Sequence, residues 1–258
     1  VLKIFILLTM IDSSIMKNFK KKDYKVICII PARGGSKGIK NKNLRKICGR
    51  SLLSYPIRAA IKSKVCDKII VSTDSEKISN LAKKLGAEVP FLRKKKFSGD
   101  RVTTEKTLQN ALQDAENFFK VKYDICVFLT CTNIFRKSSW IKTAVNELKK
   151  NNKIDSVFSV HSFYKHVWHK SGNKFVKVSK WMKSYTSRQT GQKLYREDTG
   201  LASATRSKFW RSGKRIGKKV KFIVNEDTFT GIDIHSKKDL YLAEMAMRYA
   251  KKHKLLDH

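Results

Sequence analysis

The residues best suited to do chemistry lie in a basic, glycine-rich loop near the start of the chain. Residues 31–44 read P-A-R-G-G-S-K-G-I-K-N-K-N-L, so cations, a serine hydroxyl and glycines share one short segment. Glycines permit unusual backbone dihedral angles and close approach to a ligand, and cations bind phosphate oxygens. The segment matches neither G-x-x-x-x-G-K-[ST] nor G-x-G-x-x-G. We expect it to bind a triphosphate, the alternative being a flexible basic turn.

The elements around this loop predict an α/β fold. Residues 26–32 form a continuous apolar, β-branched run that predicts a buried parallel strand. Further strands are expected at 68–73, 88–92, 124–129, 156–160, 220–224 and 231–234, and helices at 51–64, 75–85, 104–120, 138–150 and 237–252. This alternation is typical of right-handed βαβ units, and predicts a Rossmann-like three-layer sandwich with a mostly parallel sheet. Ligands bind such sheets beyond the carboxyl ends of the strands, which is where the loop lies.

The alternation breaks in one internal region. Residues 161–219 are rich in aromatic residues, Lys, Ser and Gly, and we expect them to form a small inserted lobe within a main domain of residues 25–258. Residues 1–24 are expected to be an appendage, either disordered or the result of a start site placed too far upstream. Their apolar stretch at 2–8 is too short to cross a bilayer and lacks the basic leader of a secretory signal, so we expect no membrane association.

The charge of the chain raises a second class of function. It carries 57 Lys and Arg against 21 Asp and Glu, a formal net charge of +36, which suggests nucleic acid or an anionic surface as a partner. The lysines are spread over nearly every expected helix and loop instead of forming one stripe interleaved with aromatic residues. A solvated surface is therefore favoured, and a nucleic-acid-binding protein stays as the alternative. Five widely spaced cysteines with no C-x-x-C pair indicate reduced thiols and a cytoplasmic location.

A family resemblance starts at the basic loop. The run I-I-P-A-R-G-G-S-K-G-I-K-N-K-N-L at 29–44 resembles the signature of CMP-sialic acid synthetases, or acylneuraminate cytidylyltransferases, and of relatives that act on legionaminic, pseudaminic and 3-deoxyoctulosonic acids. It continues over most of residues 25–248, for example in S-L-L-S at 51–54 and I-I-V-S-T-D at 69–74. The resemblance implies transfer of CMP from CTP to the anomeric hydroxyl of a sialic-type (nonulosonic) acid, with release of pyrophosphate, in surface polysaccharide biosynthesis. A CMP-3-deoxyoctulosonate synthetase is the alternative within the same chemistry.

The resemblance also implies a nucleotide site, formed by Ala32, Arg33, Gly35, Ser36, Lys37, Lys42, Asn43, Arg93 and Thr104. The loop residues would hold the triphosphate, with Asn43, Arg93 and Thr104 near the cytidine. Arg33 and Lys37 are the expected catalytic cations, because positive groups neutralise the charge that develops on the leaving pyrophosphate.

The acceptor side is implied by shorter matches. The pair Arg188-Gln189 resembles an R-Q element that lies against the sugar carboxylate, which an arginine fork binds with two hydrogen bonds, so Arg188 is a third catalytic candidate. Residues 129–136 read L-T-C-T-N-I-F-R where the family commonly has L-Q-P-T-S-P-L-R. Thr132 is kept as a sugar-binding candidate, but the Gln and both prolines are absent, which puts the identity of the acceptor in question. The lobe that would carry Arg188 is the one through which relatives pair, so a homodimer is expected.

A metal site is implied near the end of the chain. Residues 232–235 read I-D-I-H where the family often has I-D-I-D, and side chains one residue apart on a strand end face the same side. Asp233 and His235 are thus candidate ligands for Mg2+, or for Mn2+, which accepts imidazole more readily. Asp239 has a competing role, because S-x-x-D at 236–239 predicts a helix capping box. Three histidines lie close together in the sequence: His161, His166 and His169. No fourth ligand stands at a spacing that would complete a zinc site, so we expect these histidines to pack the lobe or line a sugar pocket.

Overall fold

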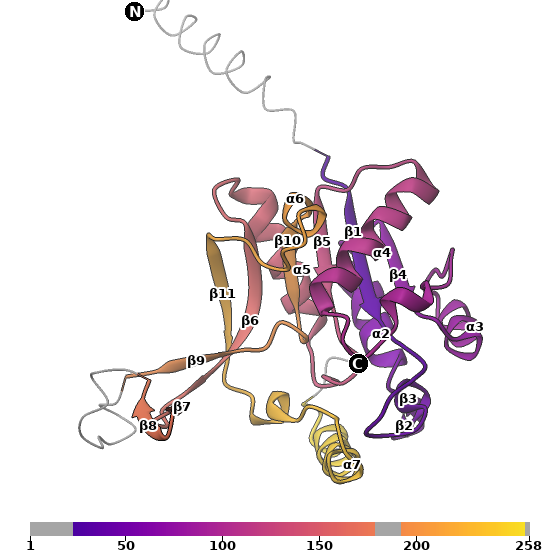
Figure 1. The fold of residues 1–258 in the computed structure, drawn as a ribbon. Helices are drawn as coiled ribbons and strands as arrows, with labels where there is room; N and C mark the ends of the chain where they lie inside the picture. The colour runs from indigo at the N-terminus through magenta and orange to yellow at the C-terminus, as the bar shows by residue number, and fades with distance from the viewer. Residues whose placement is uncertain (1–22, 179–191, 256–258) are drawn as a thin grey trace, which may run out of the picture.

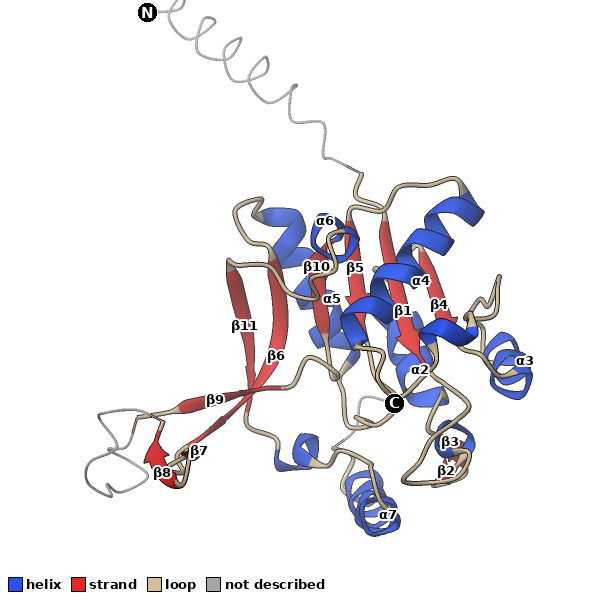
Figure 2. Cartoon of the chain, viewed as in Figure 1, coloured by secondary structure: helices blue, strands red, loops and turns tan. Residues whose placement is uncertain are grey.

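The computed structural model describes residues 23–178 and 192–255, and its body is a sheet with helices on both faces (Figures 1 and 2). Within the described residues the main sheet has seven strands in the order β11-β6-β10-β5-β1-β4, with β9 also paired to β6. The strands are β1 (Val26–Pro31), β4 (Lys68–Ser72), β5 (Ile125–Phe128), β6 (Ser156–Phe163), β9 (Leu194–Glu197), β10 (Ser203–Arg206) and β11 (Val220–Asn225). The three-layer α/β prediction is confirmed.

The sheet is mostly parallel. β1 pairs in parallel with β4 and β5, and β11 pairs in parallel with β6, whereas β10 runs antiparallel to both of its neighbours and β9 runs antiparallel to β6. β1 is apolar throughout because both of its faces are covered. Val26, Cys28 and Ile30 face one core cluster, and Ile27 and Ile29 face the other.

The helices divide between these two faces. The helical bounds are α2 (Ser54–Ser63), α3 (Glu76–Lys84), α4 (Thr104–Phe119), α5 (Ser138–Lys150), α6 (Ser207–Arg211) and α7 (Lys237–Lys252). α2, α3 and α5 bury their apolar sides in the first cluster, and α4 and α6 bury theirs in the second. α7 contributes Ala243 and Met247 to the first cluster and contacts the small hairpin of β2 (Lys46–Ile47) and β3 (Arg50–Ser51).

The expected ends of several helices are confirmed by side-chain caps. The Ser75 and Thr103 side chains accept hydrogen bonds from backbone N–H groups at the starts of α3 and α4. Gly86, with a φ of 90°, follows α3 in the left-handed region that favours glycine.

None of the helices within residues 23–178 and 192–255 is long and apolar enough to cross a bilayer.

Two strand predictions differ from the structure. Residues 88–92 form a single bridge, between Glu88 and Ile70, instead of a strand. The predicted strand at 231–234 is absent: the 3-10 helix η4 (Thr228–Gly231) ends there, and residues 232–234 belong to no strand. Glu88 bridges the edge strand β4 at one position only, and the Ile234 N–H donates to the Thr132 carbonyl in a loop, so apolar content alone overstates strand pairing in both segments.

The region expected to be an inserted lobe divides into two parts. β9 and the hairpin of β7 (Trp168–Ser171) and β8 (Lys174–Lys177) project from the body as an arm (Figure 1). β10 instead returns to the middle of the main sheet between β5 and β6, and α6 packs against it. β10 reads S-A-T-R, and its first three residues are buried although they are small and mostly polar. Such a segment has no apolar run to mark it as a strand.

Candidate active site

The basic loop leaves the sheet at the carboxyl ends of β1 and β4 and is fixed there by backbone contacts. The N–H of buried Ala32 donates to the carbonyl of Ser72 at 2.9 Å, and the N–H of Gly34 donates to Oδ1 of Asp74 at 2.8 Å. Asp74 lies two residues beyond the end of β4. The loop therefore starts from two neighbouring strand ends of the rigid sheet, as the ligand-binding position predicts.

Two of the three glycines of this loop, Gly34 and Gly38, serve close packing. Gly34, Gly35 and Gly38 do not have positive φ angles, so the expectation of unusual dihedrals is wrong for φ at these positions. A Cβ at Gly38 would collide with the carbonyl oxygen of His235, whereas a Cβ at Gly35 would meet open space. The absent side chain at position 38 lets the loop touch the segment that carries the expected metal ligands.

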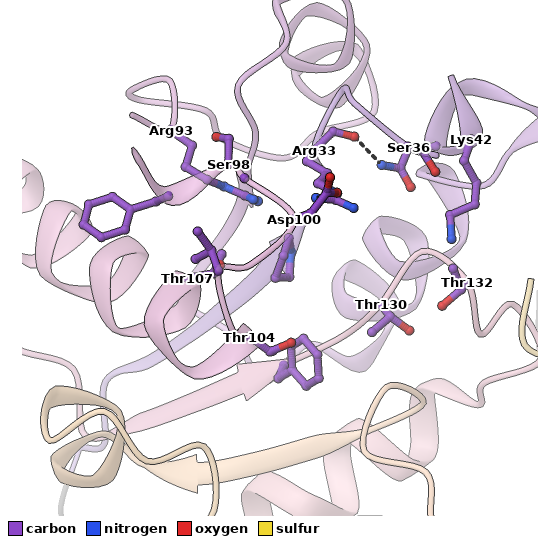
Figure 3. A pocket seen from close by; sticks show the side chains of 16 residues that line it. Arg33, Ser36, Lys42, Arg93, Ser98, Asp100, Thr104, Thr107, Thr130 and Thr132 are labelled. Atoms are coloured by element: carbon purple, nitrogen blue, oxygen red, sulfur yellow. Dashed lines mark hydrogen bonds and ion pairs between the residues drawn. The ribbon is translucent and has the colours of Figure 1, made fainter. Parts of the chain in front are cut away.

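A pocket of about 320 Å³ opens beside the loop (Figure 3). Among its lining residues are six of the nine expected at the nucleotide site: Arg33, Ser36, Lys42, Asn43, Arg93 and Thr104. Ala32, Gly35 and Lys37 are not among the lining residues. The structure thus brings together cations that are up to 60 residues apart in sequence, from position 33 to position 93. We call this the loop pocket.

Arg33 and Lys37 share one carboxylate. Asp100 lies 2.8 Å from Arg33 Nη1 through Oδ1 and 2.7 Å from Lys37 Nζ through Oδ2. The hydrogen bond from Lys37 is the larger cause that lowers the pKa of Asp100, followed by that from Arg33. The carboxylate holds both cations at the rim of the loop pocket, and Lys37 itself stays 81% exposed.

Lys42 and Asn43 connect the loop to other segments. They lie on η2 (Lys42–Leu44), where Lys42 Nζ donates to the Ile234 carbonyl at 2.9 Å and Asn43 Nδ2 donates to the Arg33 carbonyl at 3.0 Å. Burial lowers the pKa of Lys42, which the charge of Asp233 partly opposes. Lys42 thus joins the loop to the 233–235 segment.

Arg93 is held rigidly at the far wall of the loop pocket. It is 8% exposed, and its Nε donates to Ser72 Oγ at 3.0 Å while Nη2 donates to the Ser72 carbonyl. Burial lowers its pKa to about 10, so the guanidinium is still charged at neutral pH. A buried arginine with no carboxylate partner in these contacts is suited to meet an anion or a polar base edge.

A second pocket of about 380 Å³ adjoins the first. Both are lined by Thr104, Phe128, Thr130 and Thr132, which form the junction between them. The second pocket continues along Glu105, Asn133, Glu197, Asp198, Thr199, Gly200, Arg215, Asp233 and His235. We call it the junction-side pocket. Of the expected sugar-binding residues it contains Thr132, while Arg188 and Gln189 lie outside the described residues.

The positions that depart from the family pattern contact one another. Thr130 Oγ1 lies 2.6 Å from Asn133 Oδ1, and the Thr130 N–H donates to the Gly200 carbonyl at 3.0 Å. A Cβ at Gly200 would collide with both side chains. Buried Arg136 completes the arrangement by donating to the carbonyls of Thr130, Gly200 and Leu201. The substituted segment at 129–136 thus forms a consistent wall of the junction-side pocket.

The expected metal ligands face each other. His235 Nε2 and Asp233 Oδ2 are 2.8 Å apart, on side chains that are 68% and 46% exposed. Asp239 accepts from the Ser236 N–H at 2.7 Å and forms the predicted capping box of α7. Within residues 23–178 and 192–255 no group of three or more His, Cys, Asp or Glu side chains is arranged to hold a metal. The pair fits a cation that takes most of its ligands from elsewhere.

Comparison with known proteins decides the family. A family model described as cytidylyltransferase matches residues 27–253. The chain belongs to the cytidylyltransferase family. It is 30% identical to Post-translational flagellin modification protein B of Campylobacter coli over 227 residues, covering 87% of this chain and 95% of that protein. It is 32% identical to CMP-N,N'-diacetyllegionaminic acid synthase of Campylobacter jejuni over 223 residues, covering 85% and 94%.

Solved structures show the same fold. CMP:2-keto-3-deoxy-manno-octonic acid synthetase complexed with CTP matches with a TM-score of 0.65 at 13% identity, covering 87% of this chain and 99% of that one. At this identity the likeness concerns the fold of the cytidylyltransferase and not its substrate.

Several site residues of this cytidylyltransferase were not expected from the sequence. Asp74 and Asp100 lie in segments that resemble the family, but their contacts to the loop depend on tertiary structure. Arg215 lines the junction-side pocket although it lies in a region without a clear motif, and Glu197 lies there within Y-R-E-D-T-G at 195–200, which stands where the family has an E-N-G segment. The sequence did contain one signal. The chain has only 21 acidic residues against 57 basic ones, so an acidic residue close to a candidate cation is a candidate for an ion pair with it.

Proposed function

We propose that this cytidylyltransferase transfers CMP from CTP to the anomeric hydroxyl of a nonulosonic acid and releases pyrophosphate. The observation that carries the proposal is the pair of adjoining pockets, of which one is lined by cations and the other by polar groups. A nucleotide and an acceptor in adjoining pockets would meet at the four shared residues. Alignment of two reactants is itself a large part of such catalysis. The name of the Campylobacter jejuni relative supports a legionaminic or related acid.

The nucleotide belongs in the loop pocket. Arg33 and Lys37 would face the phosphates, with Ser36 and Lys42 beside them and Asn43, Arg93 and Thr104 toward the cytidine. The acceptor oxygen forms a bond to the α-phosphorus as the bond to pyrophosphate breaks. Fixed cations that neutralise the leaving group lower this barrier without reorganisation during the reaction.

We further propose Mg2+ or Mn2+ as the metal. Asp233 and His235 would hold it, and phosphate oxygens and water would supply the other ligands, as is usual for Mg2+. When bound, the metal would add positive charge next to the phosphates. Lys42, which donates to the Ile234 carbonyl, fixes this pair relative to the loop.

We propose a homodimer that pairs through the arm. The hairpin of the arm exposes Trp168, Phe175 and Val176 by 53%, 68% and 43%. Neighbouring apolar side chains on a projecting hairpin favour association. Light scattering should give about twice the 29.7 kDa monomer mass at micromolar concentration, and a monomer mass would contradict the dimer.

We also propose a cytoplasmic location, which agrees with five free cysteines.

The test is a pyrophosphate-release assay with each of the four NTPs against four acids: N-acetylneuraminic, N,N'-diacetyllegionaminic, pseudaminic and 3-deoxy-manno-octulosonic acid. We expect release with CTP and a nonulosonic acid. Equal or faster release with UTP or ATP would contradict the nucleotide assignment, and preference for the octulosonic acid would contradict the acceptor class. A nucleic-acid-binding protein would instead bind polynucleotides with a steep salt dependence and not turn over CTP.

A further inference from the structure

Arg215 enters the junction-side pocket from the loop between α6 and β11. Its side chain is 20% exposed, and its guanidinium carbon lies 5.9 Å from the centroid of the Phe128 ring. Nη1 donates to Thr199 Oγ1, Nη2 donates to Glu197 Oε1 at 2.7 Å, and Nε is 3.4 Å from Glu105 Oε1. The planar fork is thus held in one orientation by groups from α4, β9 and the following loop.

Arg215 differs in charge from the rest of the pocket. Among the described residues that line the junction-side pocket it is the only Lys or Arg, and four carboxylates line the same space: Glu105, Glu197, Asp198 and Asp233. In a chain with a net charge of +36, such a local excess of acid is unusual. Arg215 is therefore the positive side chain, among the described residues of this pocket, that could attract an anionic acceptor.

The position of Arg215 determines which part of the acceptor it would contact. Phe128, over which the guanidinium lies, is one of the four residues shared by the two pockets. The reacting anomeric carbon must lie at this junction to reach the α-phosphorus. In a 2-keto sugar acid that carbon bears both the reacting hydroxyl and the carboxylate, so the carboxylate also lies at the junction.

We propose that Arg215 binds the carboxylate of the acceptor acid and that Glu105 and Glu197 hold the guanidinium in place until the acid displaces one of them. This inference rests on the proposed function. Glu105 and Glu197 are 39% and 45% exposed, and ion pairs with such exposed carboxylates are weak enough to be exchanged. An arginine fork binds a carboxylate with two parallel hydrogen bonds, which also fixes its orientation.

A purely structural role predicts different behaviour. If Arg215 only joined α4, β9 and their neighbouring loops, loss of either Glu197 or Arg215 would lower the melting temperature and leave both Michaelis constants unchanged. If Arg215 binds the acid, its loss weakens acceptor binding, whereas loss of a competing glutamate strengthens it. The two variants then shift the acceptor KM in opposite directions.

The experiment measures KM for CTP and for whichever of the four acids supports the fastest pyrophosphate release. Arg215→Ala should raise the acceptor KM by about 10-fold or more and change the CTP KM by less than about 2-fold, as expected for loss of a charge-assisted pair. Arg215→Lys, which keeps the charge without the fork, should raise it less. Glu197→Gln should lower the acceptor KM by about 2- to 5-fold. Arg248→Ala, which removes a surface pair with Glu244 away from both pockets, is the control and should change neither constant.

The results that would overturn the assignment are distinct from those that would overturn the proposed function. An unchanged acceptor KM in folded Arg215→Ala or Arg215→Lys, or a higher acceptor KM in Glu197→Gln, would show that Arg215 is a structural link. Equal increases in both Michaelis constants in Arg215→Ala would also overturn the assignment. Absence of turnover by the wild-type chain with all four acids would contradict the proposed function, and this assignment with it.

Discussion

The loop pocket and the junction-side pocket are built in different ways. In the loop pocket, Arg93 and Asn43 are fixed by the backbone carbonyls of Ser72 and Arg33, next to strand ends of the sheet. In the junction-side pocket, side chains hold one another: Thr130 contacts Asn133 within one loop, and Arg215 pairs with Glu197 at the end of β9. When side chains are held by backbone groups, their positions can change little. When side chains hold one another, both members of a pair can be substituted together. The second pocket is thus the place where acceptor specificity can vary.

The largest expected effect concerns Asp233 and His235, which line the junction-side pocket. Asp233→Asn should lower turnover by about 1,000-fold, because a metal contributes several kcal/mol of transition-state stabilisation and Asp233 is the one carboxylate of its pair. His235→Asp should keep activity and lower the Mg2+ concentration at half-maximal rate, since carboxylate oxygen suits Mg2+ better than imidazole. A metal titration of both variants is the measurement. An unaltered Mg2+ midpoint in both would show that this segment does not bind the metal.

The next effect concerns two cations of the basic loop, one in the wall of the loop pocket and one at its rim. Arg33→Ala and Lys37→Ala should each lower kcat by about 100-fold, because each removes a positive group that we propose to face the phosphates. Circular dichroism should show an intact fold. Lys40→Ala is a matched control from the same loop, since Lys40 lines neither pocket and, unlike Lys37, is not paired with Asp100 of the pocket wall, and its rate should stay within about 2-fold. Losses below about 10-fold at both Arg33 and Lys37 would move the triphosphate elsewhere.

A stability measurement tests the packing of the junction-side pocket. Gly200→Ala places a methyl group against Asn133 and Thr130 and should cost about 1 to 3 kcal/mol, or a few degrees in Tm. Gly35→Ala meets open space and should leave Tm nearly unchanged. Thermal unfolding of the two variants makes the comparison. Equal Tm values would mean that the wall of the junction-side pocket is looser than its contacts indicate.

The smallest expected effect concerns Asp100. Its carboxylate competes with phosphate for Arg33 and Lys37, so Asp100→Asn should lower the CTP KM by about 2- to 5-fold at low salt, and less as ionic strength rises. The pKa of Asp100 lies below its usual value because of Lys37 and then Arg33, so the effect should not change across the neutral pH range. A raised CTP KM would instead indicate that Asp100 helps to bind the nucleotide.

The fold and the loop pocket could be predicted because their signals are local in the sequence. The apolar run that became β1 and the basic residues directly after it define the strand end and its loop. β10 could not be predicted, because S-A-T-R is buried through its position between two strands and not through its own hydrophobicity.

The junction-side pocket could be predicted only in part, because its residues come from distant segments. Thr130, Gly200 and Arg215 meet through the return of β10 to the centre of the sheet, which the sequence did not reveal. The substitutions in residues 129–136 were visible as departures from the family. The structural consequence of these substitutions was not visible, because it depends on contacts of Thr130 and Asn133 with each other and with Gly200.

The most direct test of the central claim follows the α-phosphate of CTP. The chain is incubated with Mg2+, CTP labelled at the α-phosphorus and N,N'-diacetyllegionaminic acid or another of the four acids, and the products are separated. We expect the label to appear in a CMP-sugar acid together with one equivalent of pyrophosphate, and UTP to react at least ~100-fold more slowly, the size of effect that lost hydrogen bonds at a polar site produce. Label that stays in CTP with all four acids, or equal transfer from UTP, would contradict the account.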